Sequence, residues 1–243
     1  MIRYATLTNK GDREVNEDSI GVFSNGDMQL FVLCDGLGGH GMGADASKLI
    51  VDVMGSQFES CEDPVNFLGD AFNTAQGVLM TEQAARHAKQ KMKTTCVTLL
   101  TDGNKVWAGH VGDSRCYFFK SGRYKKRTLD HSIPQMLALS REIKEKDIRY
   151  HPQRSFVTRV MGIEWEKPMY ELEEPLALKP NYAFMLCSDG LWELIEEKEM
   201  SALLKKSASP EEWLSKMEEH IHITGADKDM DNYSAIAVWV EKG

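Results

Sequence analysis

Five aspartates stand where apolar segments of the chain end or turn. Three of them share one pattern, in which an apolar run leads into Asp-Gly or Asp-Ser, as in FVLCDG, HVGDS and FMLCSDG. Each aspartate alone fits a turn or a helix cap equally well. If neighbouring strands bring their ends together, however, the carboxylates converge, and like charges that close cannot all stay ionised without a counter-charge. The five are Asp18, Asp35, Asp113, Asp189 and Asp231.

Oxygen ligands of this kind indicate a hard divalent cation. Carboxylates suit Mg²⁺ or Mn²⁺, whereas zinc prefers imidazoles and thiolates. The segment CDGLGGHGMG at 34–43 adds five glycines directly after Asp35. Such a loop costs conformational entropy, so it needs a reason, either a sharp turn or the close approach of another group. We expect Gly36 and the glycines after it to let a metal and its water come close to the backbone.

Three other kinds of site are weaker interpretations of the same residues. Cys34 abuts Asp35, but the CxxxxxR loop of cysteine phosphatases is missing, and a buried strand thiol is the simpler hypothesis. The glycine spacing at 34–43 is not the GxGxxG of a dinucleotide site. Ser114 and His131 lie beside acids, yet the GxSxG turn of serine hydrolases does not occur at Ser114.

Composition limits the class of protein. The chain has 243 residues, 42 % of them hydrophobic, which is enough for one large domain spanning 1–243. A net charge of −8 argues against a nucleic-acid partner, and the basic cluster at 120–127 is short. No segment approaches the roughly 20 apolar residues of a membrane span, and the N-terminus lacks a signal-peptide core. These features predict a cytoplasmic protein that does not enter the membrane.

The five cysteines show no CxxC spacing and lie mostly in apolar runs. We therefore expect reduced, buried thiols and no zinc or redox site. The five are Cys34, Cys61, Cys96, Cys116 and Cys187.

Hydrophobic periodicity predicts two runs of strands around a helical block. Asn25-Gly26 marks a hairpin, and helical periodicity extends from Ala44 to about His87. Runs of strands and runs of helices without βαβ alternation predict an α+β fold with packed sheets and outer helices. The predicted strands are 19–23, 28–33, 95–100, 105–111, 115–120, 123–129, parts of 169–177, 182–187 and 234–240, with further helices across 134–147 and within 191–221.

Seven short motifs occur in one order along nearly the whole chain. In that order and spacing they resemble the protein phosphatase 2C family of metal-dependent serine/threonine phosphatases, in its compact bacterial form. The motifs are RxxNED at 13–18, DGLGGH at 35–40, GDSR at 112–115, DHS at 130–132, HPQRSFVTRVMG at 151–162, SDGLWE at 188–193 and DNYSAI at 231–236.

The resemblance implies a sandwich of two antiparallel β-sheets with helices on both outer faces and a binuclear Mn²⁺ or Mg²⁺ centre at one end. Asp35 then matches the carboxylate that bridges both metals, and Gly36 offers its carbonyl to one of them. Asp189 and Asp231 match the remaining direct ligands. Glu17 and Asp18 match acids that hold metal-bound water or a nearby ligand position. Asp113, with Asp189, matches the pair that holds a third, weaker ion, and Arg13 matches the arginine that grips the substrate phosphate.

The implied chemistry is hydrolysis of phosphoserine and phosphothreonine in proteins by a metal-activated water, opposing a serine/threonine kinase. Two cations can screen the phosphate dianion and activate water near neutral pH, while Arg13 anchors the phosphate. We expect a monomer. The alternative is a catalytically weak relative that uses the same fold as a regulatory binding module. The acidic cluster is costly unless metal ions bind to it, and a pure binding module would have no need to keep it. This favours the enzyme.

One position departs from the family pattern. Many eukaryotic relatives have a histidine after Asp-Gly that protonates the leaving group, and here this residue is Leu37. His40 and His110 lie nearby, but we expect a metal-bound water to donate the proton, so that His40→Ala changes activity by less than tenfold. The segment Ser132–Met161 is expected to form the flap beside the cleft, with Arg159 in a structural role.

Overall fold

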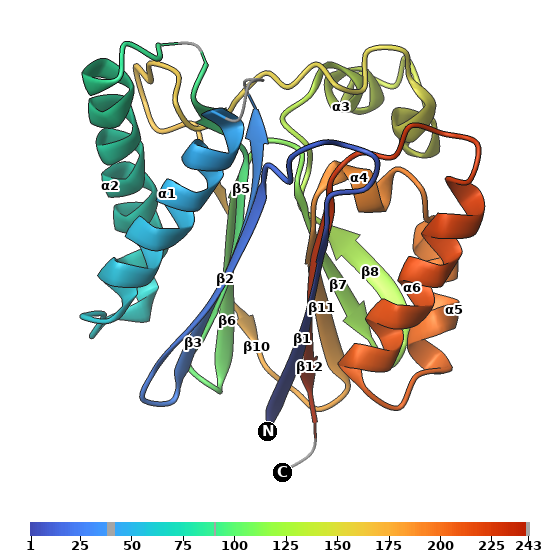
Figure 1. Cartoon of the computed structure of the whole chain (residues 1–243). Helices are drawn as coiled ribbons and strands as arrows, with labels where there is room; N and C mark the ends of the chain where they lie inside the picture. Colours follow the sequence, from blue (N-terminus) through green and yellow to red (C-terminus); the bar gives the residue numbers. More distant parts are fainter. Residues whose placement is uncertain (38–41, 90, 242–243) are drawn as a thin grey trace.

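Two antiparallel β-sheets lie face to face, with helices on both outer faces (Figure 1). The computed structural model describes residues 1–37, 42–89 and 91–241. One sheet has the strand order β1 (Ile2–Asn9), β12 (Tyr233–Val240), β11 (Tyr182–Cys187), β7 (Arg115–Lys120) and β8 (Arg123–Arg127). The other has the order β10 (Leu176–Ala177), β6 (Lys105–Val111), β5 (Cys96–Thr101), β3 (Met28–Leu37) and β2 (Asp18–Asn25), with β4 (Lys93–Thr94) beside β3 and β9 (Glu171–Leu172) beside β6.

The helices divide between the two sheets. Helices α1 (Met42–Phe58) and α2 (Pro64–Ala85) cover the sheet of β2 and β3, whereas α5 (Glu197–Lys205) and α6 (Pro210–Thr224) cover the other. The short α4 (Asp189–Trp192) follows β11, and α3 (Ile133–Leu139) and the 3₁₀ helix η1 (Glu145–Tyr150) lie in the segment between β8 and β9. The α+β sandwich predicted from the sequence is confirmed.

Strand β3 shows how one short sequence serves two layers. Successive side chains of a strand point to opposite faces. Phe31 and Leu33 accordingly lie in the core between the two sheets, whereas Leu30, Val32 and Cys34 lie in the core beneath α1 and α2. Because both faces are covered, residues 30–34 are all apolar, and Asp35 is the first charged residue of β3.

The helix boundaries follow ordinary capping chemistry. Asp63 accepts a hydrogen bond from the amide of Val65 at 2.9 Å and precedes Pro64, which suits the first turn of α2. Ser209 caps α6 in the same way, through the amide of Glu212 at 3.2 Å. Within the described residues, no helix has the length and apolarity needed to cross a membrane.

Several predicted elements differ from the observed ones. The helix predicted across 134–147 is wrong as one element, because α3 ends at Leu139 and η1 begins only at Glu145. Strand β1 was not predicted, although it pairs with β12 over its whole length. The region 169–177 contains only the two-residue strands β9 and β10. Residues 38–41 of the glycine loop, including His40, lie outside the described residues.

A buried ion-pair network joins the second half of the chain. The Arg115 guanidinium donates to both carboxylate oxygens of Asp130, at 2.8 and 2.6 Å. Arg127 donates to the same carboxylate at 3.0 Å, and all three side chains are almost fully buried. The face of Trp192 stacks on Arg115, with 3.4 Å between the guanidinium carbon and the ring centroid. Asp130 therefore bridges two buried cations, and more exposed acids assist it, because Glu145 lies 3.1 Å from Arg127 and Glu197 lies 3.8 Å from Arg115.

The network predicts a large loss of stability for Asp130→Asn. Removing one partner of a buried ion pair leaves an uncompensated charge and costs about 3–5 kcal/mol of the free energy of unfolding. Denaturant unfolding monitored by tryptophan fluorescence would measure this change. Glu164→Gln is the matched control, because the Glu164–Lys89 pair is exposed on both sides and its loss should leave the midpoint unchanged. A wild-type midpoint for Asp130→Asn would contradict the assignment.

Candidate metal centre

The hairpin of β2 and β3 places two aspartates opposite each other. The register pairs Asp18 with Asp35 and Asn25 with Met28, so Gly26 and Asp27 form the turn. Gly26 has a φ of +59°, which glycine adopts readily. Like charges directly opposite on neighbouring strands destabilise a sheet. The hairpin therefore creates an electrostatic cost at the end where both strands approach the glycine loop.

Asp18 is buried and only half satisfied. Its Oδ2 accepts a hydrogen bond from the Ser188 hydroxyl at 2.7 Å, and that hydroxyl oxygen accepts from the Ser234 amide at 2.9 Å. The other carboxylate oxygen, Oδ1, has no partner in the described part of the chain. Burial raises the pKa of Asp18 to about 6. A buried carboxylate oxygen without a hydrogen-bond donor is costly, and a cation is one partner that would satisfy it.

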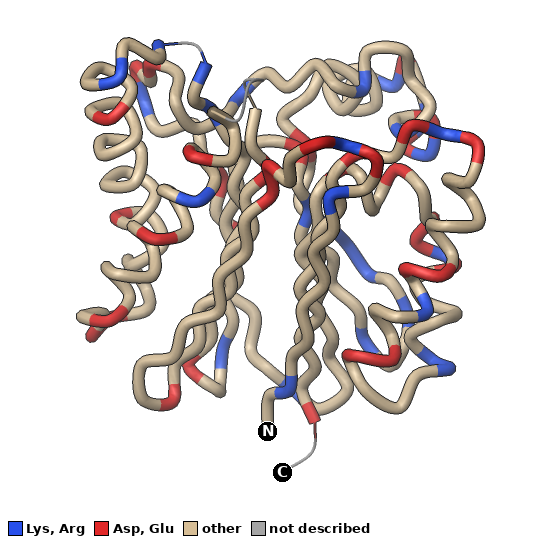
Figure 2. The backbone as a smooth tube through the Cα atoms, viewed as in Figure 1, with Lys and Arg blue, Asp and Glu red and all other residues tan. Residues whose placement is uncertain are grey.

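Asp35 lies among other carboxylates. Burial raises its pKa well above the ordinary value of 3.8, and the charges of Asp189, Asp18, Asp113 and Asp231 raise it further, in that order. The four other aspartates therefore lie close enough for their charges to act on Asp35. In Figure 2, acidic positions gather at the end of the sandwich away from the two termini, where the loops between strands lie. The register of β2 and β3 and the hydrogen bond from Trp192 to Asp113 bring several of the predicted acids near one another, and their assignment as metal ligands stays a prediction.

Asp189 and Asp113 enter this region from two neighbouring turns. Asp189 is the first residue of α4, and burial followed by the charge of Asp113 raises its pKa well above 3.8. Burial, and then the charge of Asp130, raises the pKa of Asp113 to about 7. The two turns are joined, because the Trp192 indole donates a hydrogen bond to the Asp113 carbonyl oxygen at 3.0 Å.

Arg13 and Asp231 lie together at the exposed rim of the cluster. Arg13 donates from Nε and Nη2 to the two carboxylate oxygens of Asp231 at 3.0 and 3.1 Å, and from Nη1 to Asp229 at 3.2 Å. The hydrogen bond with Asp231 is the main reason that the pKa of Arg13 is raised. The structure thus brings the predicted phosphate anchor beside the predicted metal ligands, and it pairs the guanidinium with one of them.

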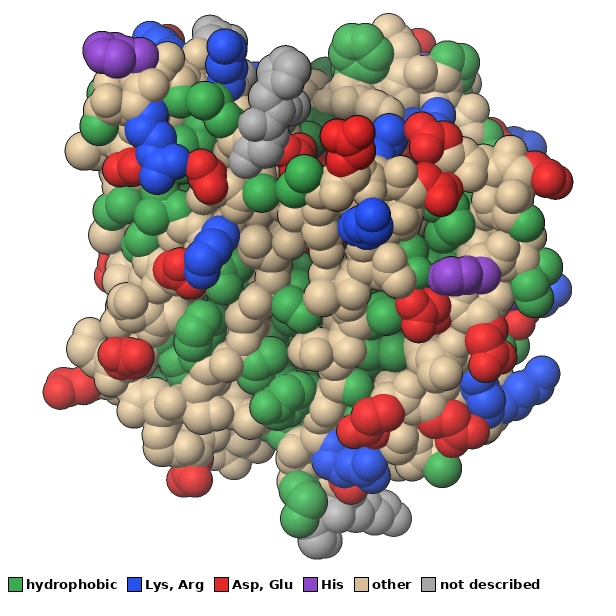
Figure 3. Space-filling model, viewed as in Figure 1, with side chains coloured by type: hydrophobic (Ala, Val, Ile, Leu, Met, Phe, Trp, Pro, Cys, Tyr) green, Lys and Arg blue, Asp and Glu red, His purple; other side chains and the backbone are tan. Residues whose placement is uncertain are grey.

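These two side chains and Asp189 line a cavity of about 500 Å³. Arg154 and Lys228 also reach it, so its wall carries both signs of charge. Figure 3 shows acidic and basic side chains side by side along this end of the molecule. A charged, open cavity beside an acidic cluster can admit a polar anion such as a phosphorylated side chain.

The first and last glycines of the loop meet at the start of α1. The Gly36 amide donates to the Glu17 carbonyl oxygen at 3.1 Å. A Cβ at Gly36 would lie 2.3 Å from the Gly43 carbonyl oxygen, and a Cβ at Gly43 would lie 2.7 Å from Oε2 of Glu17. Close backbone approach therefore explains Gly36 and Gly43, and it places the Glu17 side chain beside the loop.

The donor set fits a hard divalent cation. It consists of carboxylates, four of which have raised pKa values and one of which keeps an unpartnered oxygen, and it has no imidazole or thiolate among the predicted ligands. The carboxylates are not drawn tightly together. Within residues 1–37, 42–89 and 91–241, the one group of three ligand atoms that all lie within 4.8 Å of one another comes from His110, His131 and Glu171.

The structure gives no support to the alternative nucleophiles. Cys34 is fully buried, and burial followed by its contact with Cys96 raises the pKa of its thiol, which opposes thiolate chemistry. All five cysteines are free and buried, as predicted. The Ser114 hydroxyl forms a hydrogen bond with the Thr95 hydroxyl at 2.8 Å, while Nδ1 of His131 accepts a hydrogen bond from the Gly112 amide. Ser114 and His131 are therefore not bonded to each other.

Two residues that hold the site together were not assigned a role from the sequence. Asn232 donates from Nδ2 to the carbonyl oxygens of Lys10 and Val15, at 2.8 and 3.0 Å, and accepts from the Glu17 amide at 2.8 Å. It thereby fixes the loop that carries Arg13. Ser188 bridges Asp18 to β12. Their only signal in the sequence is their position beside Asp231 and Asp189.

Comparison with known proteins gives consistent matches. A family model described as Protein phosphatase 2C matches residues 9–230. Serine/threonine phosphatase stp of Listeria welshimeri is 28% identical over 204 residues, which cover 81% of this chain and 80% of that protein. The crystal structure of serine/threonine phosphatase Stp1 from Staphylococcus aureus superimposes with a TM-score of 0.90 at 31% identity, over 100% of this chain and 96% of that one. The catalytic domain of PstP in complex with 2 manganese ions shares the fold, with a TM-score of 0.85 at 23% identity over 99% of each chain.

The carboxylate cluster predicts an unusual pH dependence for the metal-free protein. The folded-state pKa of Asp113 is about 7, and those of Asp35 and Asp189 are raised well above 3.8, so the folded state binds more protons than the unfolded state near neutrality. The free energy of unfolding should therefore fall as pH rises from about 6.5 to about 8.

Thermal unfolding in EDTA at these two pH values would measure this effect. Saturating Mn²⁺ should largely remove it, because a bound cation keeps the carboxylates ionised at both pH values. Higher stability at the upper pH in EDTA would show that the carboxylates do not repel one another as described.

Proposed function

This chain belongs to the protein phosphatase 2C family, and from that premise we propose that it hydrolyses phosphoserine and phosphothreonine in proteins with two Mn²⁺ or Mg²⁺ ions. The observation that carries the proposal is the buried carboxylate cluster, in which Asp18 keeps an unpartnered oxygen and Asp35 is surrounded by other aspartates. A cluster of that charge is costly unless cations bind to it. The same cost counts against the alternative of a binding module without metal.

The residues that would hold the two ions are Asp35, with the Gly36 carbonyl, and Asp189 and Asp231. Glu17 and Asp18 would orient water or complete a ligand position, and Asp113 with Asp189 would hold a third, weaker ion. When bound, such cations activate water near neutral pH and stabilise the charge that develops on the phosphoryl oxygens. The carboxylates of this chain supply the negative charge and the geometry of the site, and the burial of Cys34 and the hydrogen bond of Ser114 exclude these two side chains as nucleophiles.

Arg13 positions the substrate in this proposal. Its planar guanidinium stays charged at any relevant pH and can hold two phosphoryl oxygens at once. In the structure both oxygens of Asp231 take up these donors. Three of the five N–H donors of Arg13 are engaged by Asp231 and Asp229, so two remain for phosphoryl oxygens, and bidentate binding through Nε and Nη2 would displace Asp231. The adjoining cavity, lined by Arg154 and Lys228, has room for the residues that flank the phosphate.

The biological setting forms a further part of the proposal. Substrate proteins that carry phosphoserine or phosphothreonine require a serine/threonine kinase, so a cognate kinase follows from the reaction. Five free, buried cysteines suit a reducing compartment, which supports a cytoplasmic location. We propose a monomer, since one chain contains all the proposed ligands. Size-exclusion chromatography with light scattering would test the oligomeric state.

The function is tested by hydrolysis of phosphoserine and phosphothreonine peptides with Mn²⁺, with Mg²⁺ and in EDTA. We expect turnover with either metal and none in EDTA, and a phosphotyrosine peptide serves as the comparison. Binding of phosphopeptides without turnover in saturating Mn²⁺ would favour the regulatory module instead.

Two neighbouring substitutions separate metal chemistry from thiol chemistry. Asp35→Asn should lose nearly all turnover while the protein stays folded, because the substitution removes the charge proposed to bridge both metals. Cys34→Ser should keep most of its turnover per folded molecule, because water is the nucleophile. Phosphopeptide assays with circular dichroism as the fold control would measure both. Near wild-type turnover of Asp35→Asn in saturating Mn²⁺ would disprove the assignment.

Asp113→Ala should change the metal dependence more than the fold. Its turn is proposed to serve a weaker, exchangeable ion, so the tight pair should still bind while turnover falls and requires more Mn²⁺. Calorimetric titration of the variant with Mn²⁺ would separate the two classes of site. Loss of all metal binding would instead place Asp113 in the primary site.

A further inference from the structure

The turn between β6 and β7 is held by one histidine through two hydrogen bonds. The amide of Gly112 donates to Nδ1 of His131 at 3.1 Å, and the carbonyl oxygen of Gly112 accepts from the amide of His131 at 2.9 Å. The ring nitrogen thus takes the place that a backbone carbonyl would have in a sheet. Gly112 has a φ of +107°, and a Cβ there would lie 2.6 Å from the Thr95 side chain. Asp113 is the next residue.

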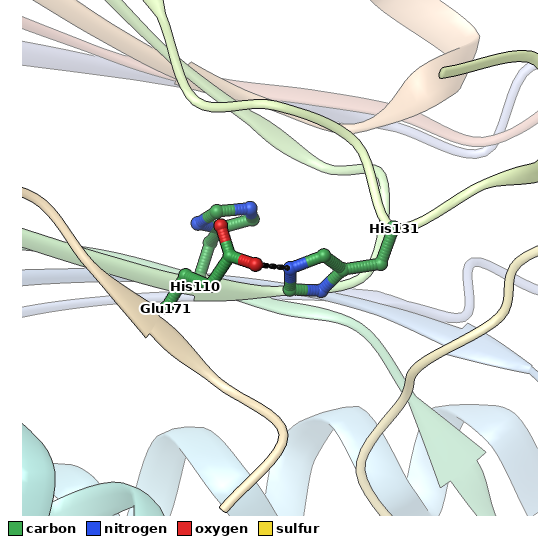
Figure 4. A group of neighbouring side chains, drawn as sticks. All are labelled: His110, His131 and Glu171. Carbon is green, nitrogen blue, oxygen red and sulfur yellow. Dashed lines mark ion pairs between the residues drawn. The ribbon is translucent and has the colours of Figure 1, made fainter. Parts of the chain in front are cut away.

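These contacts define the tautomer of His131. Because Nδ1 accepts a hydrogen bond, the proton of the neutral ring lies on Nε2. Nε2 faces Oε1 of Glu171 at 3.3 Å, and Arg159 donates to the same oxygen at 2.8 Å. Figure 4 shows the Glu171 carboxylate pointing at the His131 ring. Glu171 on β9 therefore fixes the orientation in which His131 can accept from Gly112.

Protonation of His131 is incompatible with this arrangement. A charged ring carries a proton on Nδ1, which would then face the Gly112 amide donor. Burial, followed by the charges of His110 and Arg159, lowers the pKa of His131 to about 4, although Glu171 acts in the opposite direction. The ring is consequently neutral near physiological pH, which is the state that the hydrogen bond requires.

A metal site is the other interpretation of this group. The rings of His110 and His131 stack with centroids 4.6 Å apart, and Nδ1 of His110 is buried without a partner among the described residues. However, ligation through Nε2 would force the His131 proton onto Nδ1, against Gly112. The Arg159 guanidinium already contacts Glu171 and lies 3.4 Å from Nε2 of His131. The position a metal would need thus lies beside a fixed cation.

The turn that His131 holds is tied directly to the acidic cluster. Beyond Gly112, the Asp113 carbonyl oxygen accepts from the Trp192 indole at the end of α4. Ser114 is bonded to Thr95, whose hydroxyl oxygen also accepts from the Asp35 amide at 3.0 Å. A shift of Gly112 would therefore move Asp113 relative to both Asp35 and Asp189.

We infer that His131 is a positioning residue, which holds the Gly112 turn through Nδ1 so that Asp113 faces the acidic cluster. This inference rests on the proposed function, because it takes Asp113 as a ligand of the weaker ion. His131 contacts neither substrate nor metal in this role. Glu171 and Arg159 act one step further away, by setting the tautomer of the ring.

Two substitutions of His131 separate its two ring nitrogens. In His131→Asn, Oδ1 of the asparagine is attached to Cγ and takes the position of Nδ1 of the histidine. An acceptor for the Gly112 amide therefore remains, while the link to Glu171 is lost. In His131→Gln, the longer side chain can reach Glu171, but the acceptor beside Gly112 is lost. Losing the acceptor of a buried amide is costly, so we expect the half-saturating Mn²⁺ concentration for turnover to rise about tenfold in His131→Gln and less than about threefold in His131→Asn.

A defect confined to His131→Asn would show that the contact with Glu171 is what matters. An equal defect in both variants would show that the acceptor for the Gly112 amide has no particular role, and wild-type behaviour of both would show that His131 does not position the turn. Each of these results overturns the inference.

NMR of the metal-free wild-type protein gives a readout that does not depend on activity or on a folded variant. We expect a scalar coupling across the hydrogen bond between the Gly112 amide nitrogen and Nδ1 of His131, together with ring ¹⁵N shifts of the Nε2–H tautomer. Absence of the coupling, or a Nδ1–H tautomer, would overturn the inference. So would stoichiometric Zn²⁺-induced shifts of the His110 and His131 ring nitrogens. If the wild-type protein failed to hydrolyse phosphopeptides, the proposed function would fail while these spectra still decided the role of His131.

Discussion

Repulsion among buried carboxylates is the constraint on which the functional end of this molecule depends. Asp18 and Asp35 are opposed by the register of a hairpin, and Asp113 and Asp189 join them from two turns. Burial makes each charge more costly, so the pKa values rise and one oxygen of Asp18 stays without a partner. This arrangement makes the metal-free fold less stable, and it makes the binding of divalent cations strongly favourable.

The rest of the fold makes that arrangement rigid. Two sheets with three apolar layers hold the strand ends in register, and the buried carboxylate of Asp130 fixes Arg115 and Arg127 beneath the turns. Trp192 connects this ion pair to the cluster, since its face stacks on Arg115 and its indole donates to the Asp113 carbonyl oxygen. The repulsion among the aspartates is therefore opposed by the apolar packing of the sheets and by the buried ion pairs of Asp130 beside the site.

Neutral polar side chains provide the finer adjustment around the acids. Ser188 satisfies one oxygen of Asp18, Asn232 fixes the loop that carries Arg13, and His131 holds the turn before Asp113. Each of them uses hydrogen bonds that carry no net charge, so each can orient an aspartate without neutralising it. This division leaves the buried carboxylates available to cations.

The sequence by itself determined the layers of sheets and helices, because alternating and helical hydrophobic periods are local properties. It also determined which aspartates are candidate ligands, because Asp-Gly turns have a local signature. It also predicted the hairpin at Asn25-Gly26, whereas the pairing of Asp18 with Asp35 came from the observed register. Strand β1 was decided by its pairing with β12, which lies at the other end of the chain and which no local period reveals. The Arg13–Asp231 ion pair was likewise decided only by tertiary structure, since its partners are 218 residues apart in the chain. Such contacts depend on how whole sheets pack, and only the folded chain brings those side chains within reach of one another.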